Sequence, residues 1–533
     1  MGSVRAARLA AALLVLALPA AACTVGAKRS RPTSAPTSAS KTLVVDTVFD
    51  VRTADPEREA EFTGNLVTHA LYDTLLTFKG GDVTRPVPLV AASYRVSGDG
   101  RTFTFKLRDG VRFSDGTLLT ARDVVFSFNR LLHLNGNPSF LLDGVSVAAP
   151  DDRTVVLTSA TPNPSLPFIL ANPALGIVSA KDVKAAGGTD AVGADKRDKA
   201  EAALNRASAG SGPYVLERFS TTAQIVLRAN PRYWGASKPA YARVVIRNVP
   251  ATAQRGDVQK GDSQLALDLP PAQASGMSGQ VNLVTAASPN VVYLVANENP
   301  TVSSVTANAD FRDAVRYGID YPSMVKLAGE GAVQAAGVVP SMFLGALPAG
   351  DGLRRDLTRT KAAMARSHLS KPGVDLEYPS DLTVNGVAFG PLAERVRADL
   401  KEVGITVNLK PAPVATALQH YRDGKEQLGL WLSGPDYPDP GGYLAFLPGG
   451  LVGRRAGWNA GAMPSLEALG AKAATTIEAA NRAKLYQQIQ RALNQHGPFF
   501  PVLQPGRRIA AAEAVRGVTY DPTWVVDFAS LGG

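Results

Sequence analysis

Residues 93–133 carry the clearest alternation of apolar and polar positions in the chain, in the segment "SYRVSGDGRTFTFKLRDGVRFSDGTLLTARDVVFSFNRLLH". Two runs of period two, one containing Tyr94 and Val96 and the other Phe103, Phe105 and Leu107, flank a turn at residues 98–100. Alternation on both sides of a glycine-rich turn predicts a β-hairpin with one apolar face.

The pattern changes to a helical period directly after this hairpin. Thr120 and Asp123 have the spacing of a capping box, and Val124, Phe128, Leu131 and Leu132 follow at helical spacing. We therefore expect a capped helix to begin near residue 121. The hairpin and the helix form a compact unit, but the pattern assigns no chemistry to it.

Similar alternation of helix and strand patterns continues to the end of the chain. A helix containing Phe311, Val315 and Ile319 must stop near Pro322, since proline disfavours helix in the preceding residue. Residues 392–403 predict a helix ended by Gly404, with a strand at 405–409, and Leu485, Ile489 and Leu493 line a further helix. Intermixed helices and strands indicate the α/β class.

The amino terminus differs from the rest of the chain. Arg5 and Arg8 precede about ten apolar residues, which are too few for a lasting transmembrane helix but typical of a signal peptide over residues 1–22. Cys23 follows "LPAAA", and this arrangement is similar to a bacterial lipobox, in which the thiol is acylated after cleavage. Residues 23–41, rich in Ser, Thr, Pro and Ala, predict a lipid-anchored flexible tether.

Composition and charge exclude several functional classes. The 533 residues are 45% hydrophobic and 19% charged, as in ordinary globular proteins, and suffice for two or three domains. The net charge of +10 falls to +4 without residues 1–41, which hold six basic residues and no acidic one. Their basic residues suit an anionic membrane surface, so we expect no nucleic-acid partner.

Catalytic and metal-binding signatures are missing from the sequence. It contains no HExxH, GxSxG or GxxxxGK[ST] motif, its five histidines are scattered singly, and Cys23 is its only cysteine. We therefore expect a protein that is not an enzyme, with no cofactor and no metal site. An intramolecular disulfide is excluded.

The segment "LWLSGPDYPDP", residues 430–440, places Asp436 and Asp439 in a loop stiffened by three prolines. A catalytic acid, a calcium ligand, a receptor for a positive group and a structural turn are all compatible with this pattern. Two carboxylates are too few for the six to eight oxygen ligands of calcium. Asp439, between two prolines, is typical of a turn or helix start.

Several segments together resemble family 5 of the bacterial extracellular solute-binding proteins, the peptide, oligopeptide and nickel receptors of ABC importers. They are the 94–128 segment together with "ADPEREAEFTGNLVTHALYDTLLTF", "GSGPYVLERF", "FRDAVRYGIDYPSMV", "LAERVRADLKEVGITVNLKP", "GLWLSGPDYPDP" and "RAKLYQQIQRALNQHGPFFPVLQP". They keep the family's order and span residues 43–510, essentially the whole chain after the tether.

The resemblance implies a two-lobed periplasmic-binding-protein type II fold with a hinge and an extra subdomain in the first lobe. Lobe I would comprise residues 42–92, 206–290 and 495–533, the extra subdomain 93–205, and lobe II 291–494. The phenylalanines of the 94–128 segment would then belong to the core and not to the binding site.

The resemblance also implies the binding residues. In peptide-binding relatives an aspartate of this loop pairs with the ligand's α-amino group, and the matching position is Asp436. Strand-like contacts to the peptide main chain would come from Ser433 and Gly434, and Tyr437 would be a further contact. Trp431 would either face the cleft or belong to the buried wall of the sheet. Dipeptide-specific members have an arginine before the helix at 392, where this chain has "VDLEYPSDLTVNG", so an oligopeptide is favoured over a strict dipeptide.

The function implied is that of a monomeric lipoprotein, exported and held at the outer face of the bacterial cytoplasmic membrane. It would deliver peptides to ABC permease subunits served by a separate ATPase. A surface sensor or adhesin on the same fold, a receptor for a nickel chelate or other solute, and an exported hydrolase are the alternatives.

Overall fold

The computed structural model describes residues 41–236, 238–277, 279 and 281–532. The expected signal peptide and Cys23 lie outside the described residues, as does the expected tether apart from Lys41. Among the helices of the described part, none is both long enough and apolar enough to cross a lipid bilayer.

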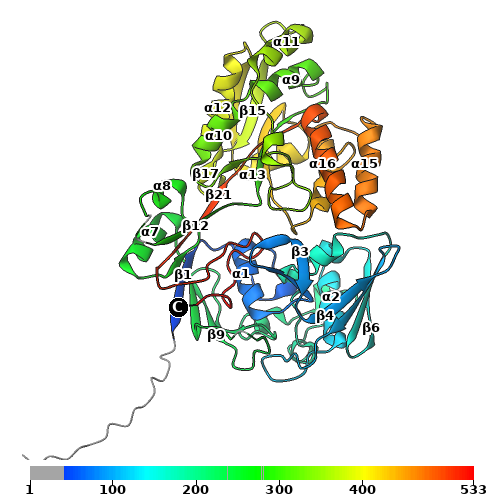
Figure 1. The fold of residues 1–533 in the computed structure, drawn as a ribbon, viewed down its shortest axis with the longest axis vertical. Coiled ribbons are helices and arrows are strands. Elements are labelled where there is room, and N and C mark those ends of the chain that lie inside the picture. Colours follow the sequence, from blue (N-terminus) through cyan, green and yellow to red (C-terminus); the bar gives the residue numbers. More distant parts are fainter. Residues whose placement is uncertain (1–40, 237, 278, 280, 533) are drawn as a thin grey trace, which may run out of the picture. The chain divides into compact units, whose positions relative to one another are not determined.

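Seven strands form the first sheet, in the order β12-β21-β11-β1-β10-β9-β8 (Figure 1). β1 pairs in parallel with β10 and β11, and its Leu43 and Val45 are fully buried. The strands are β1 (Thr42–Thr47), β8 (Tyr214–Arg218), β9 (Gln224–Ala229), β10 (Arg243–Asn248), β11 (Leu265–Ala266), β12 (Asn282–Ala287) and β21 (Gly506–Ala511). The helices of this region are α1 (Phe62–Leu71), α7 (Ala251–Lys260) and α8 (Pro271–Ala274).

Six strands form the second sheet, in the order β14-β20-β13-β19-β15-β18. Every residue of β13 is buried, which is expected for a strand covered on both faces. The strands are β13 (Val291–Ala296), β14 (Val333–Gln334), β15 (Gly373–Pro379), β18 (Thr406–Ala412), β19 (Leu428–Ser433) and β20 (Phe499–Gln504). The helices are α9 (Ala309–Gly318), α10 (Tyr321–Ala328), α11 (Leu357–Ser367), α12 (Phe389–Lys401) and α13 (Val414–Arg422), with η4 (Ala349–Asp351).

The local predictions in this part are confirmed, except that Ile319, which was expected in the helix with Phe311 and Val315, follows the end of α9 in an extended conformation. α9 ends at Gly318, and Pro322 lies in the first turn of the next helix, α10. α12 begins three residues before the expected start and ends at Lys401, and Gly404 has the left-handed φ of +84° that precedes β18. A short hairpin, β16 (Thr383–Val384) and β17 (Val387–Ala388), precedes α12.

The third sheet contains the predicted hairpin. β4 (Ala91–Val96) pairs with β5 (Thr102–Leu107), and β7 (Thr154–Ser159) and β6 (Val145–Asp151) extend the sheet. The predicted capping box is present at the start of α2 (Ala121–His133), where the Asp123 carboxylate accepts bonds from the backbone N–H and hydroxyl of Thr120. Phe103, Phe105 and Phe128 are in the core, as expected.

Short elements connect these sheets. They are the strands β2 (Leu76–Lys79) and β3 (Asp82–Pro88) and the helices η1 (Pro56–Arg58), η2 (Ser139–Leu142), α3 (Leu166–Ile169), η3 (Pro173–Leu175), α4 (Ala180–Ala185), α5 (Ala194–Arg197) and α6 (Glu201–Leu204). After β19 follow η5 (Pro440–Phe446), α14 (Leu451–Arg455), α15 (Pro464–Thr475) and α16 (Ala479–His496), and the last two lie side by side in Figure 1.

The chain passes between the first and second sheets at two adjacent places. β12 continues into β13 through residues 288–290, and β20 continues into β21 through Pro505. Ser288 donates its backbone N–H to the Pro505 carbonyl at 2.8 Å, and the Gln504 amide donates to the Ser288 carbonyl at 2.8 Å. Two short connections bonded to each other are suited to act as a hinge.

The second crossing lies later than the sequence indicated. The resemblance places residues 495–533 in lobe I, but β20 pairs with β13 and β14 in the second sheet, and the chain reaches the first sheet only at β21. The difference arises because β20 and β21 are separated by one residue, so a single extended run serves both sheets. We retain the remaining lobe boundaries as a proposal.

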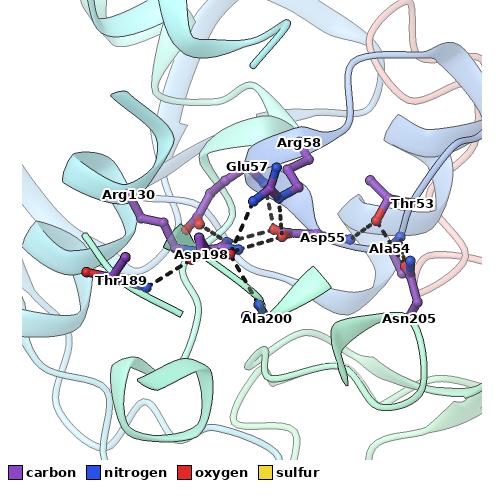
Figure 2. Close-up of polar contacts among 10 residues, drawn as sticks. All are labelled: Thr53, Ala54, Asp55, Glu57, Arg58, Arg130, Thr189, Asp198, Ala200 and Asn205. Atoms are coloured by element: carbon purple, nitrogen blue, oxygen red, sulfur yellow. Dashed lines mark hydrogen bonds and ion pairs between the residues drawn. The ribbon is translucent and has the colours of Figure 1, made fainter. Parts of the chain in front are cut away.

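A buried group of charges joins η1, α2 and the loop before α6 (Figure 2). Arg130 is fully buried and donates to Asp55 at 2.7 and 2.8 Å, to Asp198 at 2.7 and 2.8 Å, and to Glu57. Arg58 reaches Asp198 at 3.2 Å from the solvent side. We call these five residues the Arg130 cluster.

Two carboxyl groups of the Arg130 cluster have pKa values shifted in opposite directions. Burial raises the pKa of Glu57 to about 8, and the attraction of Arg130 only partly opposes it. Burial alone would also raise the pKa of Asp198, but hydrogen bonds and charge from Arg130 outweigh it and lower that pKa to about 2. Near neutral pH Glu57 is therefore protonated, whereas Asp198 is ionised beside Arg130.

Candidate ligand-binding cleft

The loop that follows β19 is fixed at its far end by Asp439. This side chain is fully buried, and it accepts the backbone N–H of Gly441 at 2.8 Å at the start of η5. Arg482 of α16 donates to it at 2.6 Å, and the Ser165 hydroxyl donates to it at 2.7 Å. Asp439 therefore holds the loop in place, and its carboxylate is not available to a ligand.

Asp436, three residues earlier in the same loop, has the opposite surroundings. Its side chain is exposed, and within the described residues no hydrogen bond or ion pair reaches its carboxylate. Its backbone carbonyl accepts a bond from the Asn172 amide at 2.8 Å, which fixes the position of the residue. Although the carboxylate meets solvent, the surrounding protein displaces much of its water and so raises its pKa.

A cavity of about 380 Å³, which we call cavity A, opens at this loop. Its wall combines Glu61 and Phe62 at the start of α1, Phe140 of η2 and Asn172 before η3 with Asn290 and Asp436. These side chains come from segments of both large sheets and of the region around the third sheet. Cavity A therefore lies where segments associated with all three sheets meet.

A second cavity of about 700 Å³, cavity B, adjoins the first. The two share Phe62, Asn290, Leu432 and Pro522 in their walls. Cavity B adds Arg507 of β21, which forms an ion pair with Asp268 at 2.9 Å and donates to the Asn385 side chain at 3.2 Å. Residues 374–386 contain no arginine, but Arg507 lies next to this segment through its bond to Asn385.

The residues predicted from the loop fall into two groups. Gly434, Asp436 and Tyr437 line cavity A. Position 434 has no room for a side chain, since a Cβ on Gly434 would lie 2.6 Å from the Asn290 side-chain oxygen. Ser433 ends β19 opposite Val291 of β13 and lines neither cavity.

Trp431 lies in the core and not at a cavity. It is 4% exposed, stacks on Tyr421 at 4.9 Å between ring centroids, and donates its indole N–H to Glu426 at 2.7 and 3.0 Å. Leu428, Leu430 and Leu432 point to the other face of β19, as alternating side chains of a strand do. We therefore leave Trp431 out of the proposed site.

One edge of β19 is open near the cavity. β19 pairs with β13 along its whole length, but with β15 only at Leu428 and Gly429. In the described part of the chain, residues 430–433 have no strand partner on the β15 side. An extended ligand chain can bind to such an edge by main-chain hydrogen bonds.

The sequence did not reveal Glu61, Phe62, Asn290 or Arg507 as cavity residues. Each stands at the end of an element or in a crossing segment, where neither periodicity nor a motif distinguishes it. The charges of the site provide no metal centre: within the described residues, no group of three or more His, Cys, Asp or Glu side chains is placed to hold a metal ion.

Comparisons with known proteins agree with this geometry. Residues 85–451 match the family described as bacterial extracellular solute-binding proteins, family 5 Middle. The chain is 28% identical over 494 residues to the probable D,D-dipeptide-binding periplasmic protein of Escherichia coli, covering 90% of this chain and 92% of that protein. It is 27% identical over 525 residues to di/tripeptide-binding protein 2 of Pseudomonas aeruginosa, covering 92% and 94%.

Solved structures show the same fold. An ABC transporter substrate-binding protein of Listeria monocytogenes superposes with a TM-score of 0.79 at 22% identity, covering 92% of this chain and 99% of that one. A periplasmic binding protein of Helicobacter pylori in complex with the peptide STSA superposes with a TM-score of 0.71 at 21% identity, covering 92% and 98%. The fold is thus that of a type II periplasmic binding protein, and the chain belongs to family 5 of the bacterial extracellular solute-binding proteins.

Proposed function

We propose that this protein is the exported receptor of an ABC importer, which captures peptides between its lobes and delivers them to permease subunits served by a separate ATPase. The observation that carries the proposal is the carboxylate of Asp436 in the wall of cavity A, which no side chain in the described part of the protein pairs with. A carboxylate fixed in advance binds an ammonium group with little ordering cost. The names of the relatives mention dipeptides, tripeptides and the tetrapeptide STSA, and they support peptides as the ligand class.

We further propose that oligopeptides are favoured over dipeptides. Cavity B extends the space beyond cavity A, and the open edge of β19 offers main-chain contacts next to Asp436. The peptide amino terminus would lie at Asp436, with Gly434 and Ser433 contacting its backbone and Tyr437 its first side chain. Closure of the lobes around the ligand would then be stabilised by contacts that exist only in the closed state.

Asp436→Asn tests the anchor. We expect it to weaken binding of Ala-Ala-Ala by about 1.5–3 kcal/mol, the usual contribution of a hydrogen bond to a charged group. For N-acetyl-Ala-Ala-Ala, which has no ammonium group, the variant and the wild type should bind equally weakly. Isothermal titration calorimetry measures both. Asp195→Asn, at an exposed position of α5, is the matched control.

The pH dependence gives a second measure of the same anchor. Since the pKa of Asp436 is raised above the ordinary 3.8, its carboxylate gains a proton at a higher pH than an ordinary aspartate. When the pH is lowered, the affinity for Ala-Ala-Ala should therefore begin to fall at a higher pH than it would with an ordinary aspartate at this position. Equal affinities of wild type and Asp436→Asn for the free peptide would remove Asp436 from the site.

We also propose that Cys23 carries a lipid that anchors the protein to the outer face of the cytoplasmic membrane, where residues 24–41 act as the tether. Cys23→Ser should move the protein from the membrane fraction to the soluble fraction and abolish labelling with radioactive palmitate. In the wild type, the lipid on Cys23 and the basic residues of the tether would act together, and two such signals give stable anchoring. Unchanged labelling of the variant would contradict acylation at this residue.

Transport is tested separately from binding. Deletion of the gene should abolish uptake of a labelled tripeptide, and the wild-type gene should restore it. Retained uptake in the deletion strain, with peptide binding intact in vitro, would favour a sensor or adhesin that binds the ligand without transport.

A further inference from the structure

The charges in the wall of cavity A are all of one sign. Glu61 and Asp436 both line it, and among its described lining residues none is a lysine, arginine or histidine. The two carboxylates come from different lobes: Glu61 precedes α1 beside the first sheet, whereas Asp436 follows β19 of the second. Closure of the lobes around a ligand would bring both against the same molecule.

The position of Glu61 is fixed by its backbone. The buried side chain of Glu59 accepts the backbone N–H of Glu61 at 2.7 Å and of Ala60 at 2.9 Å through one oxygen. Its other oxygen accepts the N–H groups of Arg52 and Thr53 at 2.9 and 3.0 Å. Glu59 therefore ties the two ends of this loop together and presents Glu61 at the cavity wall.

The present partner of Glu61 is weakly held. The ion pair with Arg52 has an N–O distance of 3.2 Å, but 78% of the Arg52 side chain is exposed, against 30% for Glu61. Exposed pairs of this kind contribute little free energy, so a ligand cation can replace Arg52 at low cost. Burial raises the pKa of Glu61 although the charge of Arg52 opposes the rise, and the charges of Asp50 and Glu59 add to it.

Aromatic rings complete the wall. Phe62 and Phe140 line cavity A and remain 46% and 44% exposed, which is unusual for large apolar side chains. Exposed rings alone would suit an apolar ligand group equally well. Here the rings occur together with carboxylates, and the described lining residues include no basic side chain. Such a wall suits a cation on an aliphatic stem, because the stem packs on the rings while the charge contacts the ring faces and the carboxylate.

We propose that the preferred ligand carries two positive charges close together, and that it is a peptide whose amino-terminal residue is lysine or arginine. The α-ammonium group would bind Asp436, and the side-chain cation would bind Glu61 beside Phe62 and Phe140. This inference rests on the proposed function and adds a specificity to it. Glu61 then acts as the residue that selects the first side chain.

The test compares Lys-Ala-Ala with norleucine-Ala-Ala, which has a similar aliphatic side chain without the charge. The full-length protein should bind the lysine peptide about tenfold more tightly, and E61Q should lose this preference. E394Q is the matched control, since Glu394 also pairs with an exposed arginine but lies outside both cavities. That variant should keep the tenfold preference.

Three results separate the possibilities. Equal binding of both peptides by the wild type, or an equal loss for both in E61Q, would overturn the inference and leave the proposed function standing. No binding of any peptide would overturn both. 1,5-Diaminopentane has two positive charges but no peptide backbone. If it bound as tightly as Lys-Ala-Ala, the inference that the ligand is a peptide would be overturned in favour of a simple diamine.

Discussion

Replacing Arg130 with methionine is expected to lower the free energy of unfolding by about 3–5 kcal/mol, the usual cost of removing one member of a buried ionic group. Methionine keeps much of the aliphatic length but removes the guanidinium that bonds Asp55, Glu57 and Asp198. Three acidic side chains would then face each other with only Arg58 to balance them. Denaturant unfolding followed by tryptophan fluorescence measures the loss.

Arg58→Met is the control, because it removes the same group from the same cluster at a different depth. The Arg58 side chain is 22% exposed, and its bonds to Asp198 and Asp55 are 3.2 and 3.4 Å long. Its loss should cost about 1 kcal/mol or less, because water can solvate the side that it leaves. Equal losses for the two variants would mean that burial of Arg130 does not determine the strength of the cluster.

The Arg130 cluster also matters for the binding site. Asp55 and Glu57 belong to the turn that leads to Glu59 and Glu61, and Arg130 fastens this turn to α2. The wall of cavity A therefore depends on a charge network that extends to α2. Weakening it should loosen the loop that carries Glu61 before the lobe as a whole unfolds.

The parts of the fold that the sequence predicts correctly are those determined within a few residues. The hairpin of β4 and β5 and the capping box of α2 depend on neighbouring side chains, so pattern alone located them. The boundary at β20 does not depend on neighbouring side chains, because its first five residues are apolar and its extended run suits either sheet. Its pairing with β13, some two hundred residues away, decides the assignment.

The same distinction applies to the site. Proline placement identified the 434–440 loop, and the resemblance to known receptors singled out Asp436 within it, but the partners of its aspartates lie far off in sequence. Asp439 is held by Arg482 and Ser165, and the wall opposite Asp436 comes from Glu61 and Phe62. A cleft between two lobes is built from chain segments that meet only after folding, and local pattern has no means of showing which ones meet.

Replacing Glu426 with glutamine is expected to stabilise the protein at neutral pH. Glu426 is 6% exposed, and burial raises its pKa from 4.5 to about 9, with the Trp431 N–H bonds opposing the rise only in part. Between these two pH values the folded protein keeps a proton that the unfolded chain releases. The free energy of unfolding therefore falls as pH rises through this window, by about 1.4 kcal/mol per pH unit.

Glutamine removes this dependence while keeping an oxygen that accepts the Trp431 N–H bond. The variant should match the wild type near pH 4.5 and exceed its stability by about 3 kcal/mol at pH 7, the free energy that the wild type spends on protonation. Glu402→Gln, at a half-exposed side chain paired with Arg355, should change stability by less than about 0.5 kcal/mol at either pH. Denaturant unfolding at both pH values measures the difference, and parallel pH profiles for Glu426→Gln and the wild type would show that Glu426 is ionised in the folded protein.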